Sequence, residues 1–301
     1  MILMKDVTKI FNIKDKRIVA VDHLNLDIRK GETFGLIGPT GSGKTTTIKM
    51  CSTLILPDEG SILIDGHDVI KEEEIIKKKI GVLAGEFVRL LYWRLTGRQN
   101  LELFAKLRNM WEYEERVERL LELFGLKDRE NDLVMHYSTG MKHKLAFAIA
   151  LLSDPPILFL DEPLTGIDPL TSYGIKKLVK EEFNEKTIIW TSHNLYEIEE
   201  MCDRIGLLNR GKLVLEGSPK DLREKYREYA KVRIVSTNTK PFLEIKGAEM
   251  GKEGVEIKTT DVTATIQDII EVCKRNNIKI DDIKTVKPSL EEIFMESVKN
   301  A

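Results

Sequence analysis

The chain has 301 residues, of which 42% are hydrophobic and 32% are charged, with a formal net charge of -2. This composition is typical of a globular protein long enough for two domains, and it excludes a disordered or fibrous chain. The charge balance gives no footprint for nucleic acid, because a dedicated nucleic-acid-binding protein usually carries a basic excess. No uncharged apolar run approaches the roughly 18 to 20 residues that cross a bilayer, so we expect a cytoplasmic protein. The three cysteines form no Cys-x-x-Cys pair, which favours reduced thiols over a disulfide framework or a zinc site.

The N-terminal segment, residues 2–28, has a strand-like pattern in which Leu24, Leu26 and Ile28 alternate with polar residues. It predicts the edge of a sheet preceding the next apolar strand. Phe11 is an aromatic residue in a polar stretch, from which its ring could stack on a base. The residues alone favour a packing role for this ring over stacking.

The next segment contains a phosphate-loop pattern, with two glycines followed by a lysine and hydroxyl residues. An apolar run at residues 34–37 predicts a buried strand before it, and residues 45–54 predict a helix after it. Glycines let the backbone N–H groups of such a loop surround phosphate oxygens, and the helix N-terminus adds its positive dipole. The lysine would reach the β- and γ-phosphates, and the hydroxyl that follows it would bind Mg²⁺. The predicted nucleotide-binding residues are Gly38, Pro39, Thr40, Gly41, Ser42, Gly43, Lys44, Thr45 and Thr46.

Beyond the loop, residues 57–66 predict a turn, a strand and a second turn, and thus a hairpin. From residue 99 to residue 124 the apolar spacing becomes helical, and Gly125 would end the second helix. We interpret roughly residues 87–154 as a helical subdomain inserted into an α/β core. The stretch at its start, residues 87–95, is rich in large apolar and aromatic groups. It is either part of the core or an exposed patch that receives a partner.

Two apolar strands are expected to end in functional side chains. Residues 157–162 end in Asp161 and Glu162, as does the magnesium-binding strand of a phosphate-loop NTPase, where the first acid reaches the metal. The second acid would polarise a water near the γ-phosphate. Residues 187–193 end in His193, which is either a structural histidine or a group facing the same phosphate, since parallel strands end at one ligand crevice. Before these two strands, Ser138 or Thr139 would cap a helix that reaches Leu152.

The C-terminal segment predicts a small α+β domain. Ser218 and Pro219 are expected to begin a helix, with Asp221 in its first turn. Strands are expected at residues 232–235, 242–245, 255–257 and 278–286, and a helix at residues 266–273. A last helix opens with Ser289 and Glu292 in the spacing of a capping box. We place the domains at residues 1–222 and 223–301.

Taken in order, the motifs of residues 1–222 closely resemble those of the nucleotide-binding subunit of an ATP-binding-cassette (ABC) transporter. Residues 38–45 match Walker A, residues 137–141 resemble the signature motif, and residues 157–162 resemble Walker B. Residues 164–168 resemble the D-loop, and His193 resembles the switch histidine. The resemblance implies an α/β phosphate-loop cassette with a mixed sheet, an antiparallel β edge and an inserted helical subdomain.

The resemblance also implies a mechanism that uses ATP and Mg²⁺. Two cassettes would pair head to tail, so that the signature of one chain caps the γ-phosphate held by the other; its residues are Ser138, Thr139, Gly140 and Met141. Phe11 would then stack on adenine, and Glu162 would act as general base. The remaining roles are metal binding by Thr45 and Asp161, contact with the γ-phosphate by His193 and coupling across the interface by Asp168. The implied partners are a second cassette and an integral membrane permease, which places the chain peripherally on the inner face of the membrane, with no nucleic acid expected. The alternative is a soluble ABC ATPase acting on ribosomes or DNA.

Two departures from the common family pattern are visible. The signature has Thr139 where glycine is commonest, a variant associated with exporter cassettes. The glutamine expected after Ile80 and Gly81 is missing, and Glu86 is the nearest candidate, similar to the glutamate of drug-resistance-type exporters. A carboxylate there would contact the metal or its water. The last helix, residues 289–294, also resembles the usual ending of that exporter group.

Overall fold

The computed structural model describes residues 1–13, 16–84, 90–225, 230–251, 254–286 and 289–299. The chain divides into two compact units, Met1–Glu216 and Gly217–Ala301. Glu86 and residues 87–89 of the aromatic stretch lie outside the described residues. In the part of the chain that the structure describes, no helix has both the length and the apolar character needed to cross a membrane.

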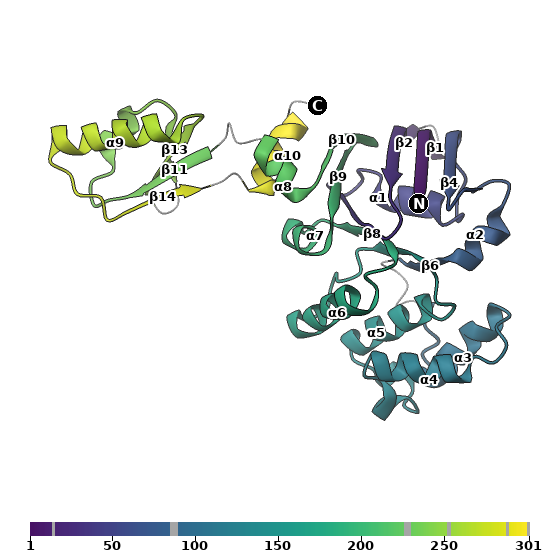
Figure 1. The fold of residues 1–301 in the computed structure, drawn as a ribbon. Helices are drawn as coiled ribbons and strands as arrows, with labels where there is room; N and C mark the ends of the chain where they lie inside the picture. Colours follow the sequence, from purple (N-terminus) through teal and green to yellow (C-terminus); the bar gives the residue numbers. More distant parts are fainter. Residues whose placement is uncertain (14–15, 85–89, 226–229, 252–253, 287–288, 300–301) are drawn as a thin grey trace. The chain divides into compact units, whose positions relative to one another are not determined.

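The first unit is built on a six-stranded sheet of order β10-β9-β3-β8-β7-β6. Figure 1 labels four of these strands, β6, β8, β9 and β10. The pairs β3–β8, β3–β9, β7–β8 and β6–β7 are parallel. Every residue of β7 and β8 is buried, as expected of parallel strands covered on both faces. The strands are β3 (Thr33–Ile37), β6 (Ile80–Leu83), β7 (Ile157–Asp161), β8 (Thr187–Ser192), β9 (Arg204–Asn209) and β10 (Lys212–Gly217).

The predicted N-terminal strands and hairpin are present, but they form a sheet of their own rather than the edge of the six-stranded sheet. Its antiparallel order is β2-β1-β4-β5. The reason is that β1 pairs with β2 on one side and β4 on the other. The strands are β1 (Ile2–Ile13), β2 (Lys16–Ile28), β4 (Glu59–Ile64) and β5 (His67–Asp68).

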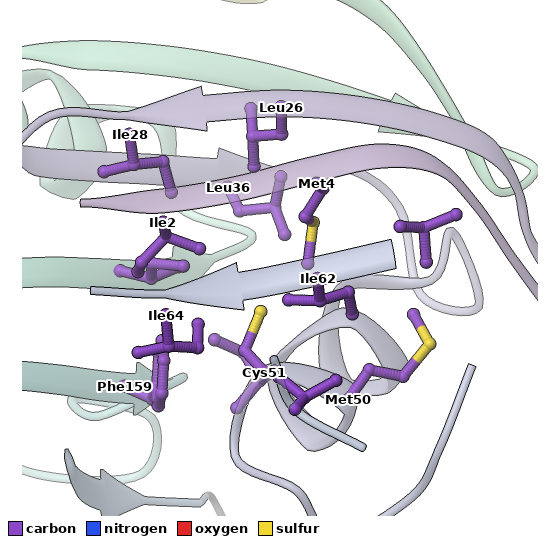
Figure 2. Close-up of a cluster of buried hydrophobic side chains, with 14 of the residues drawn as sticks. Ile2, Met4, Leu26, Ile28, Leu36, Met50, Cys51, Ile62, Ile64 and Phe159 are labelled. Carbon is purple, nitrogen blue, oxygen red and sulfur yellow. The ribbon is translucent and has the colours of Figure 1, made fainter. Parts of the chain in front are cut away.

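The main core lies where the two sheets meet α1 (Lys44–Cys51). Figure 2 shows Ile2, Met4, Leu26, Ile28, Ile62 and Ile64 of the antiparallel sheet together with Leu36, Phe159, Met50 and Cys51. Leu36 and Phe159 come from β3 and β7, and Met50 and Cys51 come from α1. The helix that follows the phosphate loop is therefore anchored to both sheets through its apolar side. It ends before the predicted position, because Thr53 adopts a left-handed backbone with φ of 62°.

The helical subdomain contains α3 (Gly97–Leu107), α4 (Glu114–Leu123) and α5 (Thr139–Ala150). The helices α3 and α4 both pack on α5, whose residues from Leu145 to Ala150 are all buried. Thr96 and Gln99 form a capping box at the start of α3, and Gly125 follows α4 with φ of 61°. The other helices of the first unit are α2 (Glu73–Lys79), α6 (Pro169–Glu182) and α7 (Leu195–Met201), with short 3₁₀ turns at Lys127–Arg129 and Val134–His136.

The second unit has a four-stranded antiparallel sheet of order β12-β13-β11-β14. Its core joins Val232, Ile234, Val255 and Ile257 of the sheet to α9. The last helix opens with the predicted capping box, since Glu292 N–H donates to Ser289 Oγ and Ser289 N–H to Glu292 Oε2. The elements are α8 (Pro219–Lys225), β11 (Ala230–Val235), a 3₁₀ turn (Lys240–Glu244), β12 (Ala248–Gly251), β13 (Gly254–Thr259), α9 (Val262–Asn276), β14 (Asp282–Val286) and α10 (Leu290–Lys299).

Two strand predictions for this unit were wrong, and one strand was missed. Residues 242–245 are not a strand: Phe242 is buried in a 3₁₀ turn that has Pro241 near its start. The last strand begins only at Asp282, and β12 was missed because its four residues, Ala248–Gly251, include no β-branched or aromatic side chain. The division between the units falls after Glu216, whereas the expected boundary at residue 222 lies inside α8, which packs on α10.

Candidate nucleotide site

The phosphate loop runs from the end of β3 at Ile37 to the start of α1 at Lys44. Its glycines are sterically required at two positions. A Cβ at Gly38 would lie 2.2 Å from the carbonyl oxygen of Leu208, and a Cβ at Gly43, where φ is 110°, would lie 2.5 Å from the carbonyl oxygen of Ala20. Backbone from β2 and β9 thus encloses the loop, leaving no room for side chains at these two positions.

Lys44 holds the centre of the loop. Its side chain is buried, and its Nζ donates hydrogen bonds to the carbonyl oxygens of Gly38 at 2.7 Å and Pro39 at 3.2 Å. Burial lowers the pKa of Lys44, while the negative charges of Glu162 and Asp161 act in the opposite direction. Lys44 therefore interacts electrostatically with both carboxylates that the sequence predicted for this site.

The two acids stand at the end of β7, beside the end of β8. Asp161 is 5% exposed, and its Oδ1 accepts a hydrogen bond of 2.5 Å from Thr191 Oγ1. The Glu162 N–H donates to both Thr191 Oγ1 at 3.0 Å and the Thr191 carbonyl oxygen at 3.1 Å. Glu162 has a left-handed backbone with φ of 49°, so the chain turns sharply where the strand ends.

The side chain of Glu162 meets His193 from the neighbouring strand. Glu162 Oε2 lies 3.3 Å from His193 Nδ1, and it accepts a hydrogen bond of 3.2 Å from Thr165 Oγ1. The imidazole is 61% exposed, whereas Ser192 before it is buried. The structure thus brings together the base candidate and the histidine that the sequence placed at two separate strand ends.

Phe11 lies on the hairpin that also encloses the phosphate loop. It pairs with Ile18 of β2, two residues before Ala20, whose carbonyl faces Gly43. The ring is half-buried, with the Lys9 ammonium 5.6 Å from its centroid. Asp58 fixes the strand just before the ring: its carboxylate accepts from the Ile10 N–H at 2.6 Å and from Lys9 Nζ at 3.1 Å.

The signature residues form the start of α5. Ser138 caps this helix, because its Oγ accepts a hydrogen bond of 3.2 Å from the Met141 N–H. Ser138 and Thr139 are exposed, while Gly140 is buried so closely that a Cβ would lie 2.7 Å from Thr171 Oγ1. Within the described ranges, no hydrogen bond joins the four signature residues to the phosphate loop of the same chain.

Asp168 has a structural role within its own chain. Its Oδ1 accepts a hydrogen bond of 2.9 Å from the Thr171 N–H and so caps α6. This backbone hydrogen bond and the Thr171 hydroxyl lower the pKa of Asp168. Since Thr171 also touches Gly140, the D-loop and the signature helix are neighbours in one chain.

The described part of the aromatic stretch, residues 90–95, is partly buried and partly exposed. Leu91 is buried, whereas Leu90, Tyr92 and Trp93 are between 51% and 58% exposed. The Lys142 ammonium, one residue after the signature, lies 4.9 Å from the centroid of the Trp93 ring. The exposed part of this stretch, which we call the aromatic patch (Leu90, Tyr92 and Trp93), therefore adjoins the signature helix.

The donor set fits a magnesium nucleotide. Ser42 Oγ is buried inside the loop and has no hydrogen-bond partner there. A phosphate oxygen bound in the loop would supply this hydroxyl with an acceptor. Thr45 is exposed at the start of α1, directly after Lys44, and Thr46 is half-buried. No group of three or more histidine, cysteine, aspartate or glutamate side chains suited to a metal occurs among the residues described. Mg²⁺ does not need one, because it is commonly held by one or two protein oxygens and the phosphates of its nucleotide.

Sequence reasoning missed two side chains that hold this site. Asp58 looked like part of a surface turn, and Thr191 looked like one more residue of a buried strand. No local pattern marks either residue, since each meets its partners only through sheet pairing or a long-range contact.

Comparisons with known proteins agree with this geometry. Residues 21–165 match the family "ABC transporter", and residues 217–298 match "ATP-binding protein DrrA1-3-like, C-terminal domain". The bacitracin transport ATP-binding protein BcrA of Bacillus licheniformis is 32% identical over 300 residues, covering 97% of this chain and 95% of that protein. ABC transporter A family member 1 of Dictyostelium discoideum is 37% identical over 236 residues, covering 78% of this chain, which spans only 27% of that longer protein. A solved dimeric ATP-binding cassette with bound ADP and phosphate superposes with a TM-score of 0.66 at 29% identity, covering 72% of this chain and 98% of the other.

Proposed function

The chain belongs to the ABC transporter family, as the ATP-hydrolysing subunit of an exporter-type transporter that uses Mg²⁺, and we propose specific roles for its site residues. The main support is that the ends of three strands, β3, β7 and β8, bring these residues together. The Lys44 ammonium interacts electrostatically with Glu162 and Asp161, and Glu162 Oε2 lies 3.3 Å from His193 Nδ1. A basic group, a metal-binding acid and a base candidate therefore surround one place where a γ-phosphate would lie.

In this proposal Glu162 accepts the proton of the water that attacks the γ-phosphate. His193 lies against the same carboxylate, so its imidazole orients Glu162 and contacts the phosphoryl oxygens. Lys44 binds the β- and γ-phosphates, and the loop N–H groups bind their remaining oxygens. Thr45 and Asp161 would hold Mg²⁺, which supplies charge neutralisation on the phosphoryl oxygens when bound. The protein's contribution is mainly positioning and preorganised charge.

The same proposal needs a second cassette. Ser138 and Thr139 are exposed at the N-terminus of α5, where a helix N-terminus favours an anion. They make no hydrogen bond to the phosphate loop of their own chain in the described ranges. We infer that Ser138, Thr139, Gly140 and Met141 complete the site of a partner cassette, with Asp168 at the interface. Phe11 stacks on the adenine ring.

The substitution Glu162→Gln tests the proposed base. It keeps the size of the side chain but removes its basicity, so ATP binding should persist while the hydrolysis rate falls by about 10²- to 10⁴-fold. An ATP-bound dimer should accumulate, measured by size-exclusion chromatography with ATP. The matched control is Glu181→Gln on the exposed face of α6, where the glutamate lies 3.9 Å from Lys177. Hydrolysis at the wild-type rate by the Glu162→Gln protein would remove Glu162 as the base.

We further propose that the aromatic patch binds an integral membrane permease, which would hold the chain on the cytoplasmic face of the membrane. Large aromatic groups half exposed beside a helical subdomain are typical of a protein-binding surface. The double variant Tyr92→Ala, Trp93→Ala should lose copurification with the permease. Trp111→Ala is the control, because Trp111 is 89% exposed on the same subdomain but lies outside the patch. If the double variant copurifies with the permease as well as Trp111→Ala does, the docking site lies elsewhere.

No observation favours the alternative of a soluble ATPase acting on ribosomes or DNA.

A further inference from the structure

We propose that Thr191 is a positioning residue whose hydroxyl orients Asp161 and Glu162 together. The proposal rests on the function proposed above, since it concerns the same site. It adds a residue that none of the motifs contains, because Thr191 lies inside β8, two residues before His193.

The hydrogen bonds of Thr191 define the direction of its hydroxyl. A threonine hydroxyl has one donor and two acceptor lone pairs. The Glu162 N–H donates to Thr191 Oγ1 at 3.0 Å, so the hydroxyl acts as an acceptor toward Glu162. Its own proton is then available for Asp161 Oδ1, 2.5 Å away, and a carboxylate can only accept there. Both partners together fix a single orientation of this buried group.

The sheet puts Thr191 in the required place. Asp161 and Thr191 are paired residues of the parallel strands β7 and β8. Thr191 is 0% exposed and Asp161 is 5% exposed, so water cannot readily replace the hydroxyl. The bond engages Oδ1 of Asp161 and restricts the rotation of its carboxylate. In the proposal, Oδ2 is the oxygen that binds the metal water.

The second partner explains how Glu162 leaves the strand. Glu162 has a φ of 49°, a conformation that a non-glycine residue adopts only when its surroundings stabilise it. Its N–H is shared between the hydroxyl and the carbonyl oxygen of Thr191. This anchors the backbone at the turn from which the Glu162 side chain meets His193. The Thr191 hydroxyl therefore fixes the position of Asp161, the proposed metal-binding acid, relative to Glu162, the proposed base.

A second threonine of β8 offers a matched control. Thr187 is 2% exposed, and its Oγ1 accepts a hydrogen bond of 2.9 Å from the Gly31 N–H at the opposite end of the strand. Thr187→Val and Thr191→Val each remove one buried hydroxyl from the same strand and replace it with a methyl group. They differ in whether the lost hydroxyl faced the two acids.

The experiment compares Thr191→Val, Thr191→Ser and Thr187→Val in the full-length protein. Three quantities are measured: the melting temperature, the Mg²⁺ concentration that half-saturates the enhancement of binding of a fluorescent ATP analogue, and kcat for ATP. Losing a partner of a metal-binding group typically costs about 10- to 100-fold in metal affinity or activity. We expect Thr191→Val to raise the half-saturating Mg²⁺ concentration and lower kcat by about that factor. Thr191→Ser keeps the hydroxyl, so its half-saturating Mg²⁺ concentration and its kcat should stay close to those of the wild type. Thr187→Val should change neither quantity.

The proposal is overturned if the Mg²⁺ dependence and kcat of Thr191→Val equal those of Thr187→Val. It is also overturned if Thr191→Ser is as impaired in both quantities as Thr191→Val. Comparison with Glu162→Gln separates this failure from that of the proposed function. Wild-type hydrolysis by Glu162→Gln would refute Glu162 as the base, yet an altered Mg²⁺ dependence in Thr191→Val would still support Thr191 as the group that orients Asp161. An inactive Glu162→Gln protein with an unchanged Thr191→Val protein would refute the Thr191 proposal alone.

Discussion

Asp58 is expected to set the affinity for ATP through the position of Phe11. Its carboxylate accepts hydrogen bonds from the Ile10 N–H at 2.6 Å and from Lys9 Nζ at 3.1 Å. Its own N–H donates to the Thr8 carbonyl oxygen at 2.9 Å. These contacts span the irregular part of β1, where the register with β2 shifts around Lys9. The strand that carries Phe11 is thus held by one side chain from the loop after α1.

The magnitude follows from the exposure of these groups. A hydrogen bond to a charged acceptor contributes about 1.5 to 3 kcal/mol, and an exposed ion pair contributes about 0.2 to 1 kcal/mol. The Asp58 side chain is 39% exposed, so water would replace part of what Asp58→Ala removes. We therefore expect a loss of about 1 to 2 kcal/mol. If this free energy holds Phe11 in place, the Kd for ATP rises by about 5- to 30-fold.

The assay is titration calorimetry of Asp58→Ala with ATP and with inorganic tripolyphosphate, which has no base to stack. We expect the Kd for ATP to rise and the Kd for tripolyphosphate to stay unchanged, with kcat at saturating ATP preserved. Asp65→Ala is the control, because Asp65 pairs with Lys79 at the other end of β4. The reasoning is refuted if the affinity for both ligands falls equally, or if Asp65→Ala weakens ATP binding as much as Asp58→Ala does.

Two further predictions concern stability. Burial lowers the pKa of His143 below 6.5, opposed by a hydrogen bond with the Pro163 backbone, so the folded state favours the neutral ring. As the pH falls below 6.5, the ring protonates first in the unfolded state, so the free energy of unfolding should decrease until the pH passes the pKa of the folded state. Urea unfolding at pH 7.5 and pH 5.5 measures this decrease, which should be smaller in His143→Gln. Arg204 Nη1 lies 2.8 Å from Oε1 of Glu32, whose side chain is 7% exposed. Arg204→Met would leave that carboxylate buried without its cation and should cost about 3 kcal/mol of unfolding free energy, whereas the double variant with Glu32→Gln should recover part of the loss. A double variant no more stable than Arg204→Met would contradict the pairing.

The sequence determined the phosphate loop, the acidic end of β7 and the cap of α5, because each depends on neighbouring residues. Glycine spacing, an apolar run and a capping hydroxyl are local properties, so the strand and helix around residues 38–45 follow from them. The failure at residues 242–245 arose where packing overrode a local pattern. Residues 242–245 have the composition of a strand, but the buried position of Phe242 holds them as a 3₁₀ turn.

Only the tertiary structure decided which of these pieces meet. Asp161, Glu162 and Thr191 come together because β7 and β8 pair in parallel, and that register is a property of the sheet rather than of either segment. The position of Phe11 depends on Asp58, 47 residues away in sequence, whose turn had no predicted role. The sequence therefore names the candidate site residues, while long-range pairing in the sheets fixes their orientation, because hydrogen-bond geometry between distant segments has no local signature.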